Sequence, residues 1–199
     1  MKQIKKFSQF IMFYSVVLLF LAMFILPYFS VDSYAIAKNT TSHLGAQKAP
    51  NAWIMNLCFL VTGLSCVVEA WLHLKNWVFQ KYVLSIFGVS FFLTGFFRHA
   101  PIVEGISYNL LQEQLHSVFA WINGFSFTLL VVSVIFIEKK RFSQLVDSVV
   151  ALFLTLLSLL MVYLSDYSGI WQRIIFIISF VWLLFFLKRM KKQVLTIRI

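Results

Sequence analysis

The sequence contains few of the residues that cross-link a soluble domain, turn its backbone or give its surface negative charge. Its 199 residues include only two cysteines, three prolines, seven glycines and seven acidic residues. Cys58 and Cys66 lie eight positions apart on one expected helix, about 12 Å along its axis, which is too far for a disulfide. The sequence therefore contains no disulfide framework, and we interpret both cysteines as small helix-packing residues.

Motifs that identify an enzyme or a carrier are also scarce. The sequence contains no G-x-S-x-G, no Gly-rich phosphate loop, no Cys-x-x-Cys and no H-E-x-x-H. No ionisable residue lies near the centre of an expected span, whereas ion-coupled carriers usually place such groups or broken helices at the bilayer midplane. A transporter, with Thr62, Cys66 and Asn123 along its path, is therefore the least favoured of the three functions considered below.

The residues that are abundant are apolar. Hydrophobic residues make up 61% of the chain and charged residues 12%. A soluble domain of this length could not hide so much apolar surface, so the bilayer must be its solvent. The formal net charge of +10 would suggest nucleic acid in a soluble protein. Here the positions of the cations indicate membrane topology instead, with membrane lipids and no nucleic acid as partners.

Long uncharged runs predict an all-α, polytopic integral membrane protein with a bundle of six transmembrane helices. The first run is too long for the roughly 7–15-residue core of a signal peptide, so we interpret it as a retained span. A single transmembrane domain is expected over residues 1–187, followed by a basic cytoplasmic tail over 188–199. The expected spans are 7–30, 52–72, 82–97, 115–137, 145–164 and 170–187.

The distribution of lysine and arginine predicts the orientation. Six spans leave thirteen of the cations on the side of the N-terminus and four on the other side. This asymmetry places both termini in the cytoplasm, in what we expect to be a bacterial plasma membrane. The four cations on the outer side are Lys38, Lys48, Arg98 and Arg173.

One expected helix, Ala52 to Leu72, carries a polar stripe along its whole length. At about 100° per residue its polar side chains fall within an arc of roughly 100°. Lipid offers such side chains no partner, so the stripe should face protein or water. Its members are Asn51, Cys58, Thr62, Ser65, Cys66, Glu69 and His73.

Most side chains able to do chemistry gather on the outer side, and three of the four histidines are among them. On the fourth span, His116 and Asn123 share an arc with Ala120 and Gly124, whose small-xxx-small spacing marks a close helix contact. His99 continues a small-residue seam on the third span. These placements predict an outward-opening polar vestibule. The expected ligand-binding residues are Ser42, His43, Arg98, His99, His116, Asn123 and Arg173.

Two functions fit such a vestibule. The favoured one is binding of a lipid or small amphiphile, as a sensor or accessory subunit. The alternative is a membrane-embedded hydrolase or lipid-modifying enzyme, in which His116 acts as base and Glu113, at i,i+3, orients it. Zinc is a speculative cofactor: His43, His99 and His116 with Glu113 or Asp166 could supply about three ligands, but only if the fold brings them together.

Four short segments carry a family resemblance: Thr41 to Ala46, Ala52 to Asn56, Leu115 to Ala120 and Gly169 to Ile174. They resemble the family called domain of unknown function 998, found mainly in prokaryotic membrane proteins. The family has a similar Ser-x-Leu-Gly element, more usually with Asp where this chain has His43. The resemblance implies a six-helix membrane protein with polar motifs at the outer face, and it carries no activity.

Overall fold

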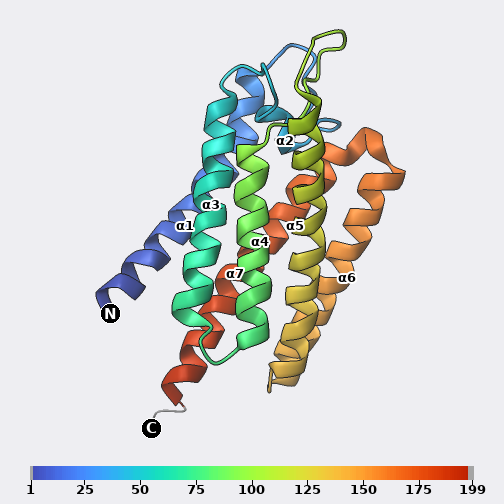
Figure 1. The fold of residues 1–199 in the computed structure, drawn as a ribbon. Helices are drawn as coiled ribbons and strands as arrows, with labels where there is room; N and C mark the ends of the chain where they lie inside the picture. The colour runs from blue at the N-terminus through green and yellow to red at the C-terminus, as the bar shows by residue number, and fades with distance from the viewer. Residues whose placement is uncertain (1, 197–199) are drawn as a thin grey trace.

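In the computed structural model the chain folds into a bundle of long helices that run alternately up and down (Figure 1). The backbone is described for residues 2–196, and the side chains for residue 3 and residues 7–191. Six helices are long and apolar enough to cross a membrane, which confirms an integral membrane protein of the predicted fold class. The long helices are α1 Lys2–Ile25, extended by η1 Leu26–Phe29, α3 Ala52–His73, α4 Val78–Phe96, α5 Leu110–Ile137, α6 Arg141–Tyr163 and α7 Ser168–Thr196.

The two ends of the bundle differ in their connections (Figure 1). We call one the terminal end, because both termini lie there with the short turns 74–77 and 138–140. We call the other the connector end. It carries the long connections 30–51 and 97–109, with the short helices α2 Thr41–Leu44 and, between α6 and α7, η2 Ser165–Tyr167.

Most of the long helices begin or end outside the predicted spans, and α5 and α7 show two of the reasons. The helix α5 begins at Leu110 instead of Leu115, because the Asn109 side chain accepts the Gln112 N–H and caps it. The helix α7 runs to Thr196, so most of the expected tail 188–199 continues the last helix. Lysine, arginine and methionine are good helix formers and no glycine or proline interrupts them. Residues 197–199 lie outside the described part of the chain.

The core of the bundle is built around α7, which crosses behind α3, α4 and α5 (Figure 1). Phe176 and Phe180 of α7 lie with their ring centroids 5.6 and 5.3 Å from Phe91 of α4. Phe176 also contacts Phe59 of α3, and Phe180 contacts Phe87 of α4. Edge-to-face contacts of this kind stabilise beyond the area they bury, so aromatic packing places α7 at the centre.

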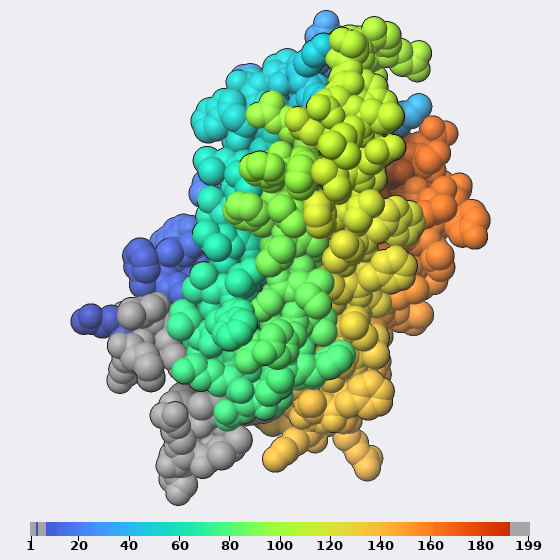
Figure 2. Space-filling view, viewed as in Figure 1, coloured from blue at the N-terminus to red at the C-terminus, as the bar shows by residue number. Residues whose placement is uncertain are grey.

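The front of the bundle is closed by α3, α4 and α5 side by side (Figure 2). Glycines allow α3 and α4 to approach closely: a Cβ on Gly88 would lie 2.7 Å from the Gly63 carbonyl oxygen. The small residues predicted on α5 behave differently. Ala120 is exposed, and no described atom lies within 4 Å of a Cβ built on Gly124. The expected close contact at this pair is wrong within the chain, because α5 packs through its larger apolar side chains instead.

Candidate functional site

The connector end is covered by its own chain. Residues 40–47, which we call the plug, fold back between the helix ends, and Thr41, Ser42 and Leu44 are buried there. The backbone N–H and the hydroxyl of Thr41 both donate to Gln172 Oε1 at 2.7 Å. Asn56 Nδ2 donates to the Gly45 carbonyl at 3.0 Å. Side-chain hydrogen bonds from α3 and α7 therefore hold the plug in place.

Gln47 fastens the plug to the other long connection. Its Nε2 donates to the carbonyls of Arg98 and Asn109, and its Oε1 accepts the Asn109 N–H at 2.8 Å. The Gln47 N–H also donates to the His99 carbonyl at 2.9 Å. One side chain thus satisfies backbone groups that the irregular 97–109 segment would otherwise leave unpaired.

Three histidines meet where the plug contacts the helix ends, and one of them, His43, belongs to the plug. The ring of His99 lies between the other two, with its centroid 4.4 Å from that of His43 and 5.2 Å from that of His116. The three residues come from α2, the connection that follows α4 and the first turns of α5. We call them the histidine cluster. The cluster brings together the three histidines expected at this end, with their rings packed against one another.

Backbone groups fix how two of these rings are oriented. His43 Nδ1 accepts the Thr40 N–H at 3.1 Å, the reciprocal bond that Glu or Gln makes in a capping box. His116 Nδ1 faces the carbonyls of Phe97, at 2.8 Å, and Thr94, and so donates to them. Burial, with the His99 and His116 rings close by, lowers the pKa of His43 to about 3. His43 is therefore neutral, as its acceptor role requires.

Glu113 pairs with His99. The i,i+3 spacing predicts a pair with His116 instead, and the structure does not show that pair. Glu113 Oε2 lies 3.5 Å from His99 Nδ1 and accepts the Ala100 N–H, while Oε1 accepts the Ser117 hydroxyl at 3.0 Å. The His99 and Glu113 side chains are 25% and 19% exposed. This pair therefore forms a partly exposed edge of the cluster, and the His43 side chain is half-buried.

The other expected ligand-binding residues are placed differently. Arg98 is exposed next to His99 in the chain. Ser42 is buried within the plug. Asn123 lies seven residues beyond His116, about 10 Å deeper along α5. Its Oδ1 accepts the Ser90 hydroxyl at 2.7 Å, so Asn123 joins α5 to α4 and does not meet the cluster.

Arg173 turns inward and holds the connector end together. Its guanidinium donates to the carbonyls of Met23, Ile36, Asn39 and Gly169, and to the Tyr34 hydroxyl at 2.7 Å. The side chain is buried, and a planar five-donor group suits such a set of acceptors. These contacts indicate that Arg173 anchors the 30–51 connection to α1 and α7.

The terminal end carries a second polar cluster, built from ion pairs. The stripe of α3 faces inward as predicted, and Thr62, Ser65, Cys66, Glu69 and His73 are buried. The Glu69 carboxylate accepts the Ser8 hydroxyl at 2.6 Å and lies 3.5 Å from His73 Nε2 and 3.3 Å from Lys191 Nζ. Glu69 thus joins α3 to α1 and α7.

Sequence reasoning missed the strongest part of this second cluster. Asp147 of α6 is fully buried, accepts the Trp182 indole N–H at 2.7 Å and binds Arg189 through both carboxylate oxygens, at 2.7 and 3.1 Å. Glu138 lies 3.4 Å from the same guanidinium. A lone aspartate in an apolar run, with arginine in a nearby basic segment, was the signal that could have indicated this pair.

The speculative zinc site is not assembled in the expected form. Among the described residues, no three His, Cys, Asp or Glu side chains are arranged to hold a metal ion. The Nδ1 atoms of His43 and His116 are hydrogen-bonded to backbone groups. Asp166, one of the possible ligands, instead lies 3.7 Å from Lys38 in an exposed ion pair.

Comparison with known proteins adds one match. A family model described as a protein of unknown function, DUF998, matches residues 15–187. Curated proteins and solved structures give no match. The family model covers α3 to α6, the second part of α1 and most of α7, and with them the plug and the histidine cluster. Lys191 and Arg189, the partners of Glu69 and Asp147 on α7, lie beyond the matched residues.

Proposed function

The chain belongs to DUF998, a family of proteins of unknown function, and we propose that it binds the anionic headgroup of a lipid or small amphiphile at the connector end. The observation that carries this proposal is the partial exposure of the His99–Glu113 pair, next to an exposed Arg98. The Arg98 guanidinium can bind a phosphate or carboxylate through two parallel hydrogen bonds, as a bidentate pair. Glu113 and the Ala100 carbonyl hold His99 Nδ1, so Nε2 is the ring atom left for a ligand.

We propose a sensor or accessory role because the same ring contacts the plug. His99 lies between the accessible edge of the site and His43 of α2. A ligand that moves or protonates His99 would therefore change the contact with His43. Plug position and ligand occupancy would then be linked, and each would bias the other by the same free energy.

The proposed orientation has the terminal end in the cytoplasm, in a bacterial plasma membrane. The support is the excess of lysine and arginine at that end, including the exposed Lys75, Lys139, Lys140 and Arg141. The connector end would then meet lipid or solutes on the outer side. A reporter that is active only in the cytoplasm should be active when fused after the C-terminus, and one that is active only outside it should be inactive.

Lipid binding to purified protein in detergent tests the proposal. Native mass spectrometry with phosphatidylglycerol would compare the wild-type protein, Arg98→Gln and the matched control Lys38→Gln. Lys38 is an exposed cation at the same end. We expect about tenfold weaker binding in Arg98→Gln, since a charge-assisted hydrogen bond contributes about 1.5 kcal/mol or more. Equal binding by both variants would reject the site.

A second function, a hydrolase or lipid-modifying enzyme, is favoured by the same pair. A carboxylate beside imidazole Nδ1 is the arrangement that orients a general base, and here the base would be His99. Hydrolysis of a short-chain phospholipid that is lost in His99→Ala and lowered in Glu113→Gln would favour the enzyme. Binding without turnover would favour the sensor.

A further inference from the structure

We propose a second lipid site, independent of the histidine cluster: a groove between α4 and α5 at the terminal end binds an anionic glycerophospholipid. One acyl chain lies in the groove and the phosphate lies at the basic turns that flank it. The argument depends on the shape of the groove, on its lining and on cations that have no carboxylate to neutralise them.

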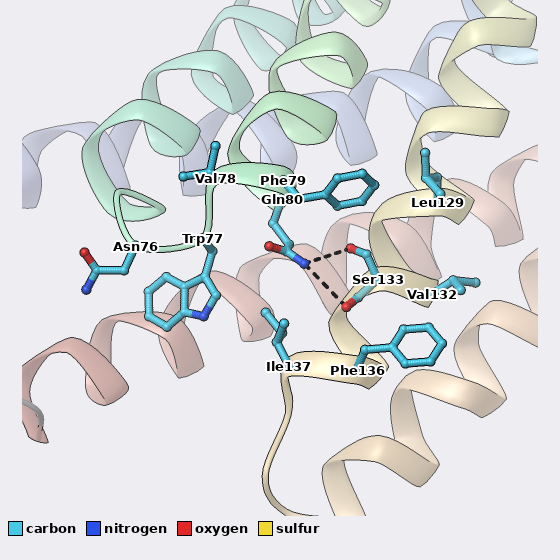
Figure 3. Close-up of a pocket in the computed structure, with 10 residues that line it drawn as sticks. All are labelled: Asn76, Trp77, Val78, Phe79, Gln80, Leu129, Val132, Ser133, Phe136 and Ile137. Atoms are coloured by element: carbon cyan, nitrogen blue, oxygen red, sulfur yellow. Dashed lines mark hydrogen bonds between the residues drawn. The ribbon is translucent and has the colours of Figure 1, made fainter.

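The groove lies between the start of α4 and the end of α5 and has a volume of about 520 Å³. This volume is within the roughly 300–1,000 Å³ of typical small-molecule sites. At its floor, Gln80 Nε2 donates to the carbonyl and the hydroxyl of Ser133, at 3.4 and 3.2 Å (Figure 3). This bridge fixes the spacing of the two helices. Most of the other lining side chains are apolar and include Phe79, Leu129, Val132 and Phe136.

Polar groups occur where a headgroup would lie. Asn76 and Trp77, in the turn before α4, line the end of the groove nearest the termini (Figure 3). Asn76 is exposed, and tryptophan is the residue typical of the membrane–water interface. An acyl chain in the groove would therefore have its glycerol and phosphate at the level of these two side chains.

The charge at this level is positive and uncompensated. Lys75 precedes Asn76, and Lys139, Lys140 and Arg141 follow the last groove residue, Ile137; all four cations are exposed. Within the described side chains, the ion pairs found involve other cations. The nearest acid along the chain, Glu138, is engaged with the backbone N–H groups of Lys139 and Lys140 and with Arg189. Charge complementarity therefore selects an anionic lipid.

A second groove provides an internal comparison. It measures about 440 Å³ and lies against α1 and α3, lined by Phe7, Phe10, Ile11, Tyr14, Ser15, Leu18 and Val61. The hydroxyl of Ser15 donates to its own helix at Met12. The lining carries no charged side chain, so this groove is a second place where an acyl chain can bind.

The test is native mass spectrometry of the purified protein in detergent, titrated with phosphatidylglycerol and with phosphatidylcholine of identical acyl chains. We expect phosphatidylglycerol to bind at least tenfold more tightly. Lys139→Gln with Lys140→Gln should weaken it about fivefold for each charge removed and leave phosphatidylcholine unchanged. Lys38→Gln, at the connector end, is the charge control.

A groove-filling variant tests the acyl-chain part of the site. Leu129 is exposed and lines the groove, so Leu129→Trp should block it and lower binding of both lipids. Leu152→Trp replaces a comparably exposed leucine on α6 that does not line the groove, and should change the binding of neither lipid. A thermal unfolding curve checks that both variants fold.

The proposal is overturned if the two lipids bind equally, or if Leu129→Trp binds phosphatidylglycerol as the wild-type protein does. Loss of the preference in Arg98→Gln alone would overturn this site and support the one at the connector end. Loss of the preference only in Lys139→Gln with Lys140→Gln would support this site and count against the one at the connector end.

Discussion

The polar clusters at the two ends of the bundle provide partners for buried polar side chains in different ways. At the terminal end, Glu69 and Asp147 are buried and each has a cationic partner on α7. At the connector end, the neutral His43 accepts a backbone N–H, His116 donates to backbone carbonyls, and the His99–Glu113 pair is partly exposed. The first cluster pairs its buried carboxylates with cations, whereas the second joins its buried histidine rings to backbone groups.

This difference indicates which end of the bundle resists movement and which end can respond to a ligand. Breaking a buried ion pair leaves an uncompensated charge in a low-dielectric environment, so the terminal end should resist movement of α7. The plug, by contrast, is held by hydrogen bonds from side chains such as Gln172 and Asn56, each of modest net strength. Arg173 anchors the connection at Ile36 and Asn39, so it is the plug itself, residues 40–47, that a ligand or a proton can shift at a smaller cost in free energy.

The largest effect is expected from the terminal end. Asp147→Ala should lower the free energy of unfolding by about 3–5 kcal/mol, because it leaves Arg189 and the Trp182 N–H without their carboxylate. Denaturation with SDS in mixed micelles, followed by circular dichroism, measures this.

The matched control is Asp166→Asn, which removes an acid from an exposed ion pair and should cost about 0–1 kcal/mol. If Asp147→Ala lowered the free energy of unfolding no more than the control does, the ion pairs would not hold α7 in place, and the contrast between the two ends would fail.

The next effect is a pH dependence at the connector end. The pKa of His43 is lowered from 6.5 to about 3 in the folded protein. Between these values the unfolded chain binds more protons than the folded one, so the free energy of unfolding decreases as the pH falls. From about pH 7.5 to about pH 5 the expected loss is about 2 kcal/mol, measured by the same denaturation at both pH values.

His43→Gln isolates this contribution. Glutamine can accept the Thr40 N–H as a capping-box residue does, but it does not titrate. His99 and His116 face His43, and Glu113 lies behind His99, so only the difference between wild type and variant is assigned to His43. An identical pH dependence in both proteins would mean that the plug is indifferent to protonation of His43.

The sequence predicted the fold well because a bilayer leaves a long apolar run few choices. A spanning segment must satisfy its own backbone, so hydropathy alone indicated six helices and their alternation. Alternation in turn placed three histidines at one end, where they meet. The inward face of the α3 stripe followed from helical periodicity in the same way.

The remainder depended on how helices are rotated and paired, which one sequence does not reveal. Arg173 at a span end has the pattern of a headgroup anchor, but α7 is rotated so that its guanidinium meets backbone carbonyls. Asp147 and Arg189 are 42 residues apart and meet only because α6 and α7 are antiparallel neighbours. Gly124 satisfied a packing pattern and faces outward. The plug was unpredictable because polar loops follow no periodicity.

The smallest effect compares one hydrogen bond at each end. Ser8 donates to the buried Glu69 carboxylate at 2.6 Å, and Ser117 donates to the partly exposed Glu113 carboxylate at 3.0 Å. Serine-to-alanine substitution is the same change at both sites. Ser8→Ala should lower the free energy of unfolding by about 1.5 kcal/mol, and Ser117→Ala by about 0.5 kcal/mol, because water can replace the lost donor only at the exposed site. Equal losses in SDS denaturation would show that the edge of the histidine cluster is as closed as the terminal end, and a ligand could then reach His99 only after the plug had moved.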